Sequence, residues 1–142
     1  MLKEVLIRIL AAVVLGGLIG YERERRHRPA GFRTIMLVCL GSTLVTFLAS
    51  GLLDGQNGAA IIAAIVTGIG FLGAGSIISG NNNGNGKNNN VMGITTAATI
   101  WLIACVGIGI GLGYYIESAI VVLVSYLILE FGGYLEVRSK LK

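Results

Sequence analysis

The amino-acid sequence predicts an all-α integral membrane bundle of five transmembrane helices. The chain has 142 residues, of which 54% are apolar and only 13% are charged. Soluble domains carry roughly a quarter charged residues, so this chain has too little charge to cover a water-soluble globule. Long apolar runs give it a mean hydropathy of +0.80. A basic segment, residues 20–34, lies between the first two runs and holds five of the eleven Lys and Arg residues.

The apolar runs have the length that a membrane crossing requires. A hydrocarbon core about 30 Å thick is crossed by roughly 20 helical residues. The fifth run is short for a full crossing, and Tyr114 and Tyr115 at its start mark the membrane interface, where amphipathic rings settle. The predicted spans are Leu2–Gly20, Thr34–Leu53, Ala59–Ile78, Gly93–Gly113 and Tyr115–Leu129.

Polar segments connect these spans. Asp54–Gly58 predicts a compact turn. The tract Asn81–Asn90 consists of Asn, Gly and one Lys, a composition that cannot build a packed core, so we expect a solvated loop. For the domain organisation, we predict a transmembrane domain over residues 1–133 and a short cytoplasmic tail over residues 134–142.

The distribution of basic residues predicts the orientation in the membrane. Short loops rich in Lys and Arg are retained in the cytoplasm, so residues 20–34 are expected inside. Five spans then place the N-terminus outside and the C-terminus in the cytoplasm. Lys87 and the basic residues of the tail fall inside as well, whereas only Lys3 and Arg8 fall on the outer side.

The basic net charge does not indicate nucleic-acid binding. The net charge is +4, but the basic residues border apolar spans and form no separate basic domain. The lipid bilayer is therefore the expected partner, and no nucleic acid is expected.

Two patterns that resemble cofactor or metal sites have simpler explanations. Residues Gly68–Gly73 match the dinucleotide fingerprint G-x-G-x-x-G, but they lie in an uncharged span with no acidic residue in the following segment. Cys39 and Cys105 lie inside apolar runs without a second Cys or His at ligand spacing, so we expect reduced, packed thiols. No cofactor and no metal site are expected.

Glycines at helical spacing indicate close helix approach within the membrane. Gly16 with Gly20, and Gly107 with Gly111, form G-x-x-x-G pairs. Such pairs serve either packing within one chain or a dedicated dimer face, and both interpretations remain open from the sequence, so a homo-oligomer is one possible state.

Two blocks of sequence resemble the MgtC/SapB family of membrane domains. The first reads G-Y-E-R from Gly20, followed by A-G-F-R-T from Ala30. The second reads G-I-G-F-L-G-A-G from Gly68, followed by G-I-T-T-A-A-T-I-W from Gly93. The candidate functional residues that these motifs imply are Glu22, Arg23, Arg26, Gly31, Arg33, Thr34, Gly70, Gly73, Gly75, Thr95, Thr96 and Trp101.

The resemblance implies a protein of the bacterial inner membrane tied to growth in low magnesium and, in pathogens, to survival inside host cells. It implies a regulator of other membrane proteins, such as ATP synthase. An older proposal for the family is magnesium transport. This chain departs from the family in its longer Asn-rich loop, and it stops soon after Leu129, where many members continue into a soluble C-terminal domain.

Catalysis is not expected, because no nucleophile, base and orienting group can be assembled. His27, the single histidine, sits among arginines and is expected to be solvated. A path for Mg²⁺ requires oxygen ligands, and spans two to four contain no acidic residue. This disfavours a transporter or channel for Mg²⁺ or another small ion, although backbone carbonyls at glycine-rich breaks remain an alternative source of ligands.

Three groups of polar residues each leave two interpretations open. Glu22 forms either local ion pairs with the neighbouring arginines or a proton or cation site. Thr95, Thr96 and Thr99 either cap a helix and bond locally or between helices, or face a polar cavity with Arg33 that holds a phosphate or a partner's carboxylate.

Arg8 is the charge deepest in the first span. It either pairs locally with Glu4 at i,i+4 spacing and reaches toward the headgroups, or it forms an intramembrane pair with Glu117 that docks the first span on the fifth.

Overall fold

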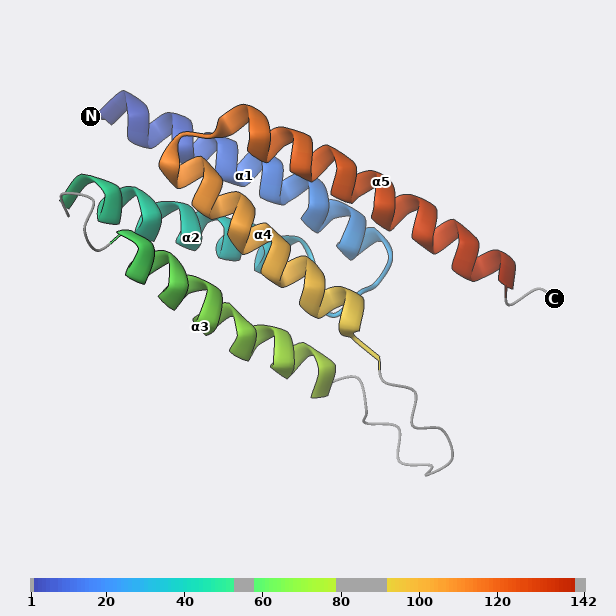
Figure 1. The fold of residues 1–142 in the computed structure, drawn as a ribbon. Coiled ribbons are helices and arrows are strands. Elements are labelled where there is room, and N and C mark those ends of the chain that lie inside the picture. The colour runs from blue at the N-terminus through green and yellow to red at the C-terminus, as the bar shows by residue number, and fades with distance from the viewer. Residues whose placement is uncertain (1, 53–57, 79–91, 140–142) are drawn as a thin grey trace.

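The described residues form five helices that lie side by side in one bundle (Figure 1). The computed structural model describes residues 2–52, 58–78 and 92–139, without the side chains of 52, 78 and 133–139. The helices are α1 (Leu2–Arg25), α2 (Phe32–Leu52), α3 (Gly58–Ile78), α4 (Ile94–Leu112) and α5 (Tyr115–Ser139). No strand occurs in these ranges, so the all-α prediction is confirmed. The predicted Asn81–Asn90 loop, and all but the last residue of the predicted Asp54–Gly58 turn, lie outside them.

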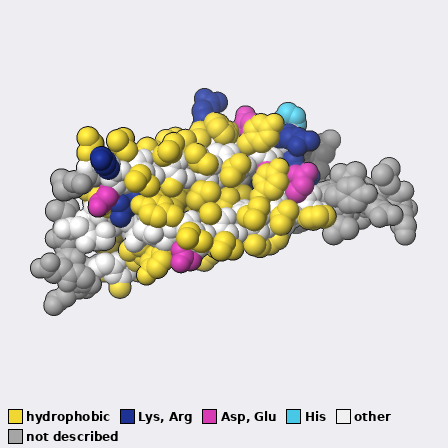
Figure 2. Space-filling model, turned by 90° about the horizontal axis from the view of Figure 1, so that it is seen from above, with side chains coloured by type: hydrophobic (Ala, Val, Ile, Leu, Met, Phe, Trp, Pro, Cys, Tyr) yellow, Lys and Arg dark blue, Asp and Glu magenta, His cyan; other side chains and the backbone are white. Residues whose placement is uncertain are grey.

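Four of the helices are long and apolar enough to cross a membrane, namely α2, α3, α4 and α5. Helix α1 is not among these four, and Lys3, Glu4 and Arg8 lie in its first turns. Figure 2 shows a face that is covered largely by hydrophobic side chains, as expected for helices in contact with lipid. The start of α1 and the end of α5 lie at opposite ends of the bundle (Figure 1). The predicted orientation across the membrane stays a prediction.

Two helices are longer than the sequence predicts. Helix α1 continues past Gly20 to Arg25, so much of the predicted basic loop is helical. Helix α5 continues past Leu129 to Ser139, and the predicted domain boundary after residue 133 falls inside it. Charged residues such as Glu and Arg have good helix propensity, so the loss of hydrophobicity that ends a span does not end the helix.

Helix α4 is the centre of the bundle and α3 its edge. Helix α4 is the most buried of the four apolar helices and contacts each of the others, whereas α3 is the least buried. In Figure 1, α3 and α5 lie on opposite sides of α4. The buried core is formed by apolar side chains from α1, α2, α4 and α5, including Ile19, Ile35, Cys39, Ile103, Ile110 and Val122.

Glycines bring the central helices into backbone contact. A Cβ on Gly111 of α4 would lie 2.6 Å from Thr46 Cβ and 2.8 Å from the Thr43 carbonyl oxygen of α2. A Cβ on Gly20 of α1 would lie 2.9 Å from the Phe32 Cα. The predicted packing role of both G-x-x-x-G pairs within one chain is therefore confirmed. The small residues of α3 differ, because Gly68, for example, has nothing within 4 Å of such a Cβ.

Overpacking at this contact provides the first test. We expect Gly111→Ala to lower the free energy of unfolding in detergent by about 1–3 kcal/mol, because the added methyl group has no space against α2. Gly41→Ala is the matched control, since a Cβ there meets nothing within 4 Å. Thermal unfolding of the purified variants measures both effects. Equal stability of the two variants would contradict the close α2–α4 contact.

Candidate functional site

The polar residues of the first motif gather at the end of α1, where the chain turns back into α2. His27 adopts a left-handed conformation with φ 52°. Its N–H donates to the Glu24 carbonyl at 3.0 Å, and the N–H of Arg28 donates to the Arg23 carbonyl at 3.0 Å. This pair of hydrogen bonds is the Schellman arrangement that ends many helices, in a position usually held by glycine. The role of His27 is thus to close α1, and its side chain is exposed, as predicted.

Glu22 is the centre of this cluster. Its side chain is only 2% exposed, and its Oε1 lies 2.7 Å from Arg26 Nε. Its Oε2 lies 3.8 Å from Arg23 Nη1. Neither oxygen accepts an aligned hydrogen bond from a described residue, so the charge is stabilised by ion pairing. A buried carboxylate needs such partners because burial without them costs several kcal/mol. Local ion pairing, one of the two interpretations of Glu22, is what the structure shows.

Arg23 links α1 to α4. Its Nη2 donates a buried hydrogen bond to Thr96 Oγ1 at 3.1 Å. Arg23 is 3% exposed and Thr96 is 2% exposed, so this bond lies in the interior of the bundle. Residues from the two sequence motifs therefore meet directly at this point.

Arg26 links α1 to α5. Its Nη2 lies 3.1 Å from Glu130 Oε2 and donates to the Glu130 backbone carbonyl at 3.2 Å. Glu130 is not among the residues predicted for the site. The sequence does offer one signal for Glu130. It is a lone carboxylate at the end of an apolar run, at the same end of the bundle as the basic segment.

Glu24 stabilises the start of α2. Its Oε2 accepts a hydrogen bond from the Phe32 backbone N–H at 3.0 Å, so it caps a helix that has no side-chain cap of its own. A Cβ on Gly31 would collide with this carboxylate. A side chain at position 31 would therefore displace the Glu24 carboxylate from the Phe32 N–H.

Other motif residues lie apart from the cluster. Arg33 and Thr34 are exposed at the start of α2, and Gly70, Gly75 and Trp101 are exposed on α3 and α4. Only Gly73 is buried, where its Cβ position lies 3.6 Å from the Cβ of Ala97. The structure does not show the interpretation in which the threonines share a polar cavity with Arg33. The cavity beside Thr95 is lined by Arg23, Arg26 and Arg28, because Arg33 lies on the exposed side of the first turn of α2.

The predicted intramembrane pair of Arg8 and Glu117 is also corrected. Arg8 Nη1 lies 3.9 Å from Glu4 Oε2, and Arg8 Nε donates to the Gly111 carbonyl at 3.3 Å. The guanidinium also stacks over the Phe47 ring, 4.5 Å from its centroid. Glu117 is exposed, and no ion pair joins it to Arg8 in the described part of the chain. Arg8 thus contacts α4 and α2, whereas Glu117 is exposed on α5.

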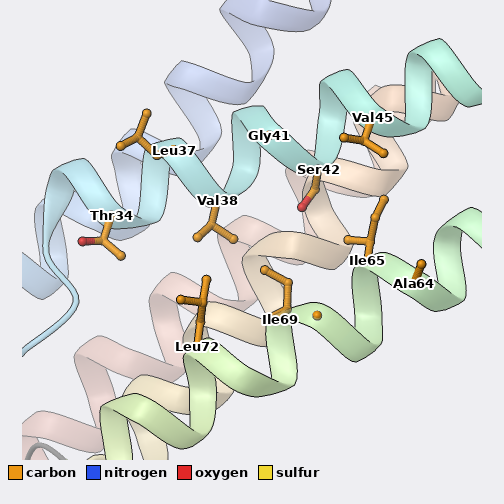
Figure 3. Close-up of a pocket in the computed structure, with 11 residues that line it drawn as sticks. Thr34, Leu37, Val38, Gly41, Ser42, Val45, Ala64, Ile65, Ile69 and Leu72 are labelled. Atoms are coloured by element: carbon orange, nitrogen blue, oxygen red, sulfur yellow. The ribbon is translucent and has the colours of Figure 1, made fainter.

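An apolar groove lies between α2 and α3, away from the polar cluster (Figure 3). Its volume is about 550 Å³. Helix α2 contributes Thr34, Val38, Gly41 and Ser42, among others, and α3 contributes Ala64, Ile65, Gly68, Ile69 and Leu72. The side chains of Val38, Ile69 and Leu72 point toward one another across the groove in Figure 3.

The described residues offer no ready metal site. No three His, Cys, Asp or Glu side chains among them lie close enough to hold a metal ion.

Comparison with known proteins identifies the family of this chain. Residues 9–138 match the model of the MgtC family. The chain belongs to the MgtC family. It is 46% identical over 114 residues to "Protein MgtC" of Brucella abortus, covering 79% of this chain and 44% of that protein.

Two further relatives show the same pattern. "Protein MgtC" of Salmonella typhimurium is 40% identical over 128 residues, covering 88% of this chain and 52% of that protein. "Putative magnesium transporter YhiD" of Escherichia coli is 39% identical over 123 residues, covering 81% of this chain and 54% of that protein. The chain thus spans about half the length of these MgtC-family relatives. No solved structure matches it.

The two carboxylates that contact Arg26 provide a matched test of the site. We expect Glu22→Gln to destabilise the protein by about 3–5 kcal/mol, because it leaves Arg23 buried without its carboxylate. Glu130→Gln should cost less than about 1 kcal/mol, because Glu130 is 43% exposed. Unfolding in detergent measures both values. Equal losses would show that Glu22 is not the centre of the cluster.

Proposed function

We propose that this chain is a small regulator of other membrane proteins that acts through helix contacts within the bilayer. In this proposal it resides in the bacterial inner membrane, supports growth in low magnesium and, in a pathogen, survival inside host cells. It acts by binding and carries out no chemical reaction. The MgtC-family membership supports a multi-pass membrane protein, and the name of the YhiD relative supplies the link to magnesium.

The observation that carries the proposal is the groove between α2 and α3. Small residues on both sides, Gly41 from α2 and Ala64 and Gly68 from α3, lower the groove walls so that the backbone of another helix can approach. Helix α3 is the least buried apolar helix, so the groove is accessible from the lipid side. A surface of this kind suits a transmembrane helix of a partner.

The lining of the groove also favours an apolar partner. Thr34 and Ser42 are the polar residues among those that line it. A membrane protein such as ATP synthase fits this chemistry, and a second copy of this chain is the alternative occupant.

For the topology, we propose that α1 is a fifth span, with the N-terminus outside and the C-terminus in the cytoplasm. The contacts of Arg8 with Glu4, the Gly111 carbonyl and the Phe47 ring support this, because they supply partners for a charge in the first turns of a membrane helix.

The second candidate function is a transporter or channel for Mg²⁺ or another small ion, which the name of the YhiD relative favours. Three of the buried hydroxyl groups of the spans support it poorly. Thr43, Thr99 and Ser125 each donate to a carbonyl of their own helix, at 2.8, 2.7 and 2.6 Å. Hydroxyl groups with this local bonding are typical of helix packing.

Filling the groove tests the regulator. We expect Ala64→Leu to abolish growth in low magnesium when the chain complements a strain that lacks its own family member, because the leucine occupies the path of the partner helix. Ala63→Leu is the matched control, since Ala63 is exposed on the same helix but does not line the groove. Equal growth of the two strains, at equal protein levels, would contradict the groove as the working surface.

An ion-flux assay separates the two functions. We expect the purified chain in liposomes to give no saturable Mg²⁺ flux above that of empty vesicles. Saturable Mg²⁺ flux that Ala64→Leu leaves unchanged would contradict the regulator and favour the transporter.

A further inference from the structure

Ser42 of α2 carries a buried hydroxyl group that has no partner in the described part of the chain. The residue is only 5% exposed. Hydroxyl groups inside helices commonly donate to a carbonyl three or four residues earlier. Thr43, the next residue of α2, donates in this way to the Cys39 carbonyl at 2.8 Å. Ser42 forms no hydrogen bond with a described residue, so its hydroxyl group is available to another molecule.

This hydroxyl group opens into the apolar groove between α2 and α3. Ser42 is one of the residues that line the groove, and in Figure 3 its side chain is directed from α2 toward α3. The unpaired Oγ1 of Thr46, by contrast, is fully enclosed by protein atoms, whereas Ser42 Oγ is not. A molecule that occupies the groove can therefore form a hydrogen bond with Ser42 Oγ.

The position of Ser42 is fixed by close packing and lies deep in the predicted span. A Cβ on Gly107 of α4 would lie 2.8 Å from Ser42 Cβ, so α2 and α4 touch at this point. Ser42 is also the middle residue of α2, which has 21 residues from Phe32 to Leu52. In an α2 that spans the bilayer, this places Ser42 near the midplane. There is no water at that depth to bind an unpaired hydroxyl group, and leaving it unpaired is costly.

Three simple occupants of the groove do not suit this arrangement. A lipid acyl chain has no hydrogen-bonding atom to offer Ser42. A bound water needs about two to four polar partners, and Thr34, the other polar side chain of the lining, lies about two helical turns away. A small ion needs charged or several polar ligands, and no charged residue lines the groove.

A transmembrane helix suits both the shape and the chemistry of the groove. Gly41 on one wall, with Ala64 and Gly68 on the other, lets a helix backbone approach closely. The Ser42 hydroxyl group is attached to a single side-chain carbon, so it reaches a neighbouring helix only at such a short separation. Ser, Thr, Asn and Gln side chains form hydrogen bonds between membrane helices, and one of them on the partner would pair with Ser42.

We infer that Ser42 is the specificity contact of the groove, and that the partner is a largely apolar transmembrane helix with one Ser, Thr, Asn or Gln near its middle. Small residues one turn before and one turn after that polar residue complete the partner surface, because larger ones would hold the two backbones apart. This inference rests on the proposed function, since it takes a partner helix as the occupant of the groove. It adds which helices the groove accepts.

Synthetic transmembrane peptides test this contact. Two peptides share a leucine-rich helix with lysines at both ends and alanine one turn before and after the central position. The central residue is Thr in one peptide and Val in the other, which has nearly the same shape but no hydroxyl group. Fluorescence energy transfer between each labelled peptide and the labelled chain in liposomes measures the affinity. We expect the Thr peptide to bind about three- to tenfold more tightly than the Val peptide.

Two serine variants of α2 locate the contact. Ser42→Ala should bring the affinities of the two peptides to within about twofold of each other. Ser50→Ala is the matched control, because Ser50 is exposed, does not line the groove and donates to the Phe47 carbonyl at 2.9 Å. This control should keep the full preference for the Thr peptide. A preference that survives Ser42→Ala, or that is absent in the unchanged chain, would overturn the inference. Thermal unfolding of each variant verifies that it is folded.

The groove variant Ala64→Leu separates this inference from the proposed function. Ala64 lines the groove, so the leucine should weaken the binding of both peptides. If it does so while the Thr and Val peptides bind the unchanged chain equally, the groove remains a helix site and only the role of Ser42 is overturned. Binding that Ala64→Leu leaves unchanged, or no binding of either peptide, would overturn both the groove and the inference.

Discussion

The buried charge of Glu22 is the constraint on which the polar end of this bundle depends. A carboxylate with 2% exposure must be neutralised locally, and Arg23 and Arg26 do so from the same helix. Each arginine then has donors left for a second helix: Arg23 reaches Thr96 of α4, and Arg26 reaches Glu130 of α5. One buried charge thereby fixes α1 against both helices and aligns the arginines along one cavity.

Close packing dominates in the remainder of the bundle, where Arg8 adds a hydrogen bond to the Gly111 carbonyl. Gly107 and Gly111 bring α4 against α2, and Gly16 and Gly20 bring α1 against the same helix. Helix α3 lacks such contacts over much of its length, which leaves its small residues open toward the groove. The molecule therefore combines three closely packed helices, α1, α2 and α4, with α3, which has an uncovered face.

The sequence predicts the number and approximate position of the helices because a hydrophobic run of spanning length has few other structures available in a membrane. It does not predict where α1 ends, since Glu22 and Arg26 at i,i+4 spacing extend the helix into a segment that composition alone marks as a loop. The sequence does not predict the contact of Arg26 with Glu130 either, because the two residues are 104 positions apart. Helix geometry explains why Arg23 and Arg26, and not Arg33, belong to the polar cluster. Arg23 and Arg26 lie on one face at the end of α1, whereas Arg33 lies in the first turn of α2, after the turn at His27.

The central claim is that the bond from Arg23 to Thr96 couples the two family motifs. The most direct measurement is a double-mutant cycle on unfolding in detergent with Arg23→Met, Thr96→Val and the double variant. A hydrogen bond to a charged group predicts a coupling energy of about 1.5–3 kcal/mol between these positions. The same cycle with Thr95→Val should show none, because Thr95 is exposed. Losses for Arg23 and Thr96 that add to within about 0.5 kcal/mol would contradict the account.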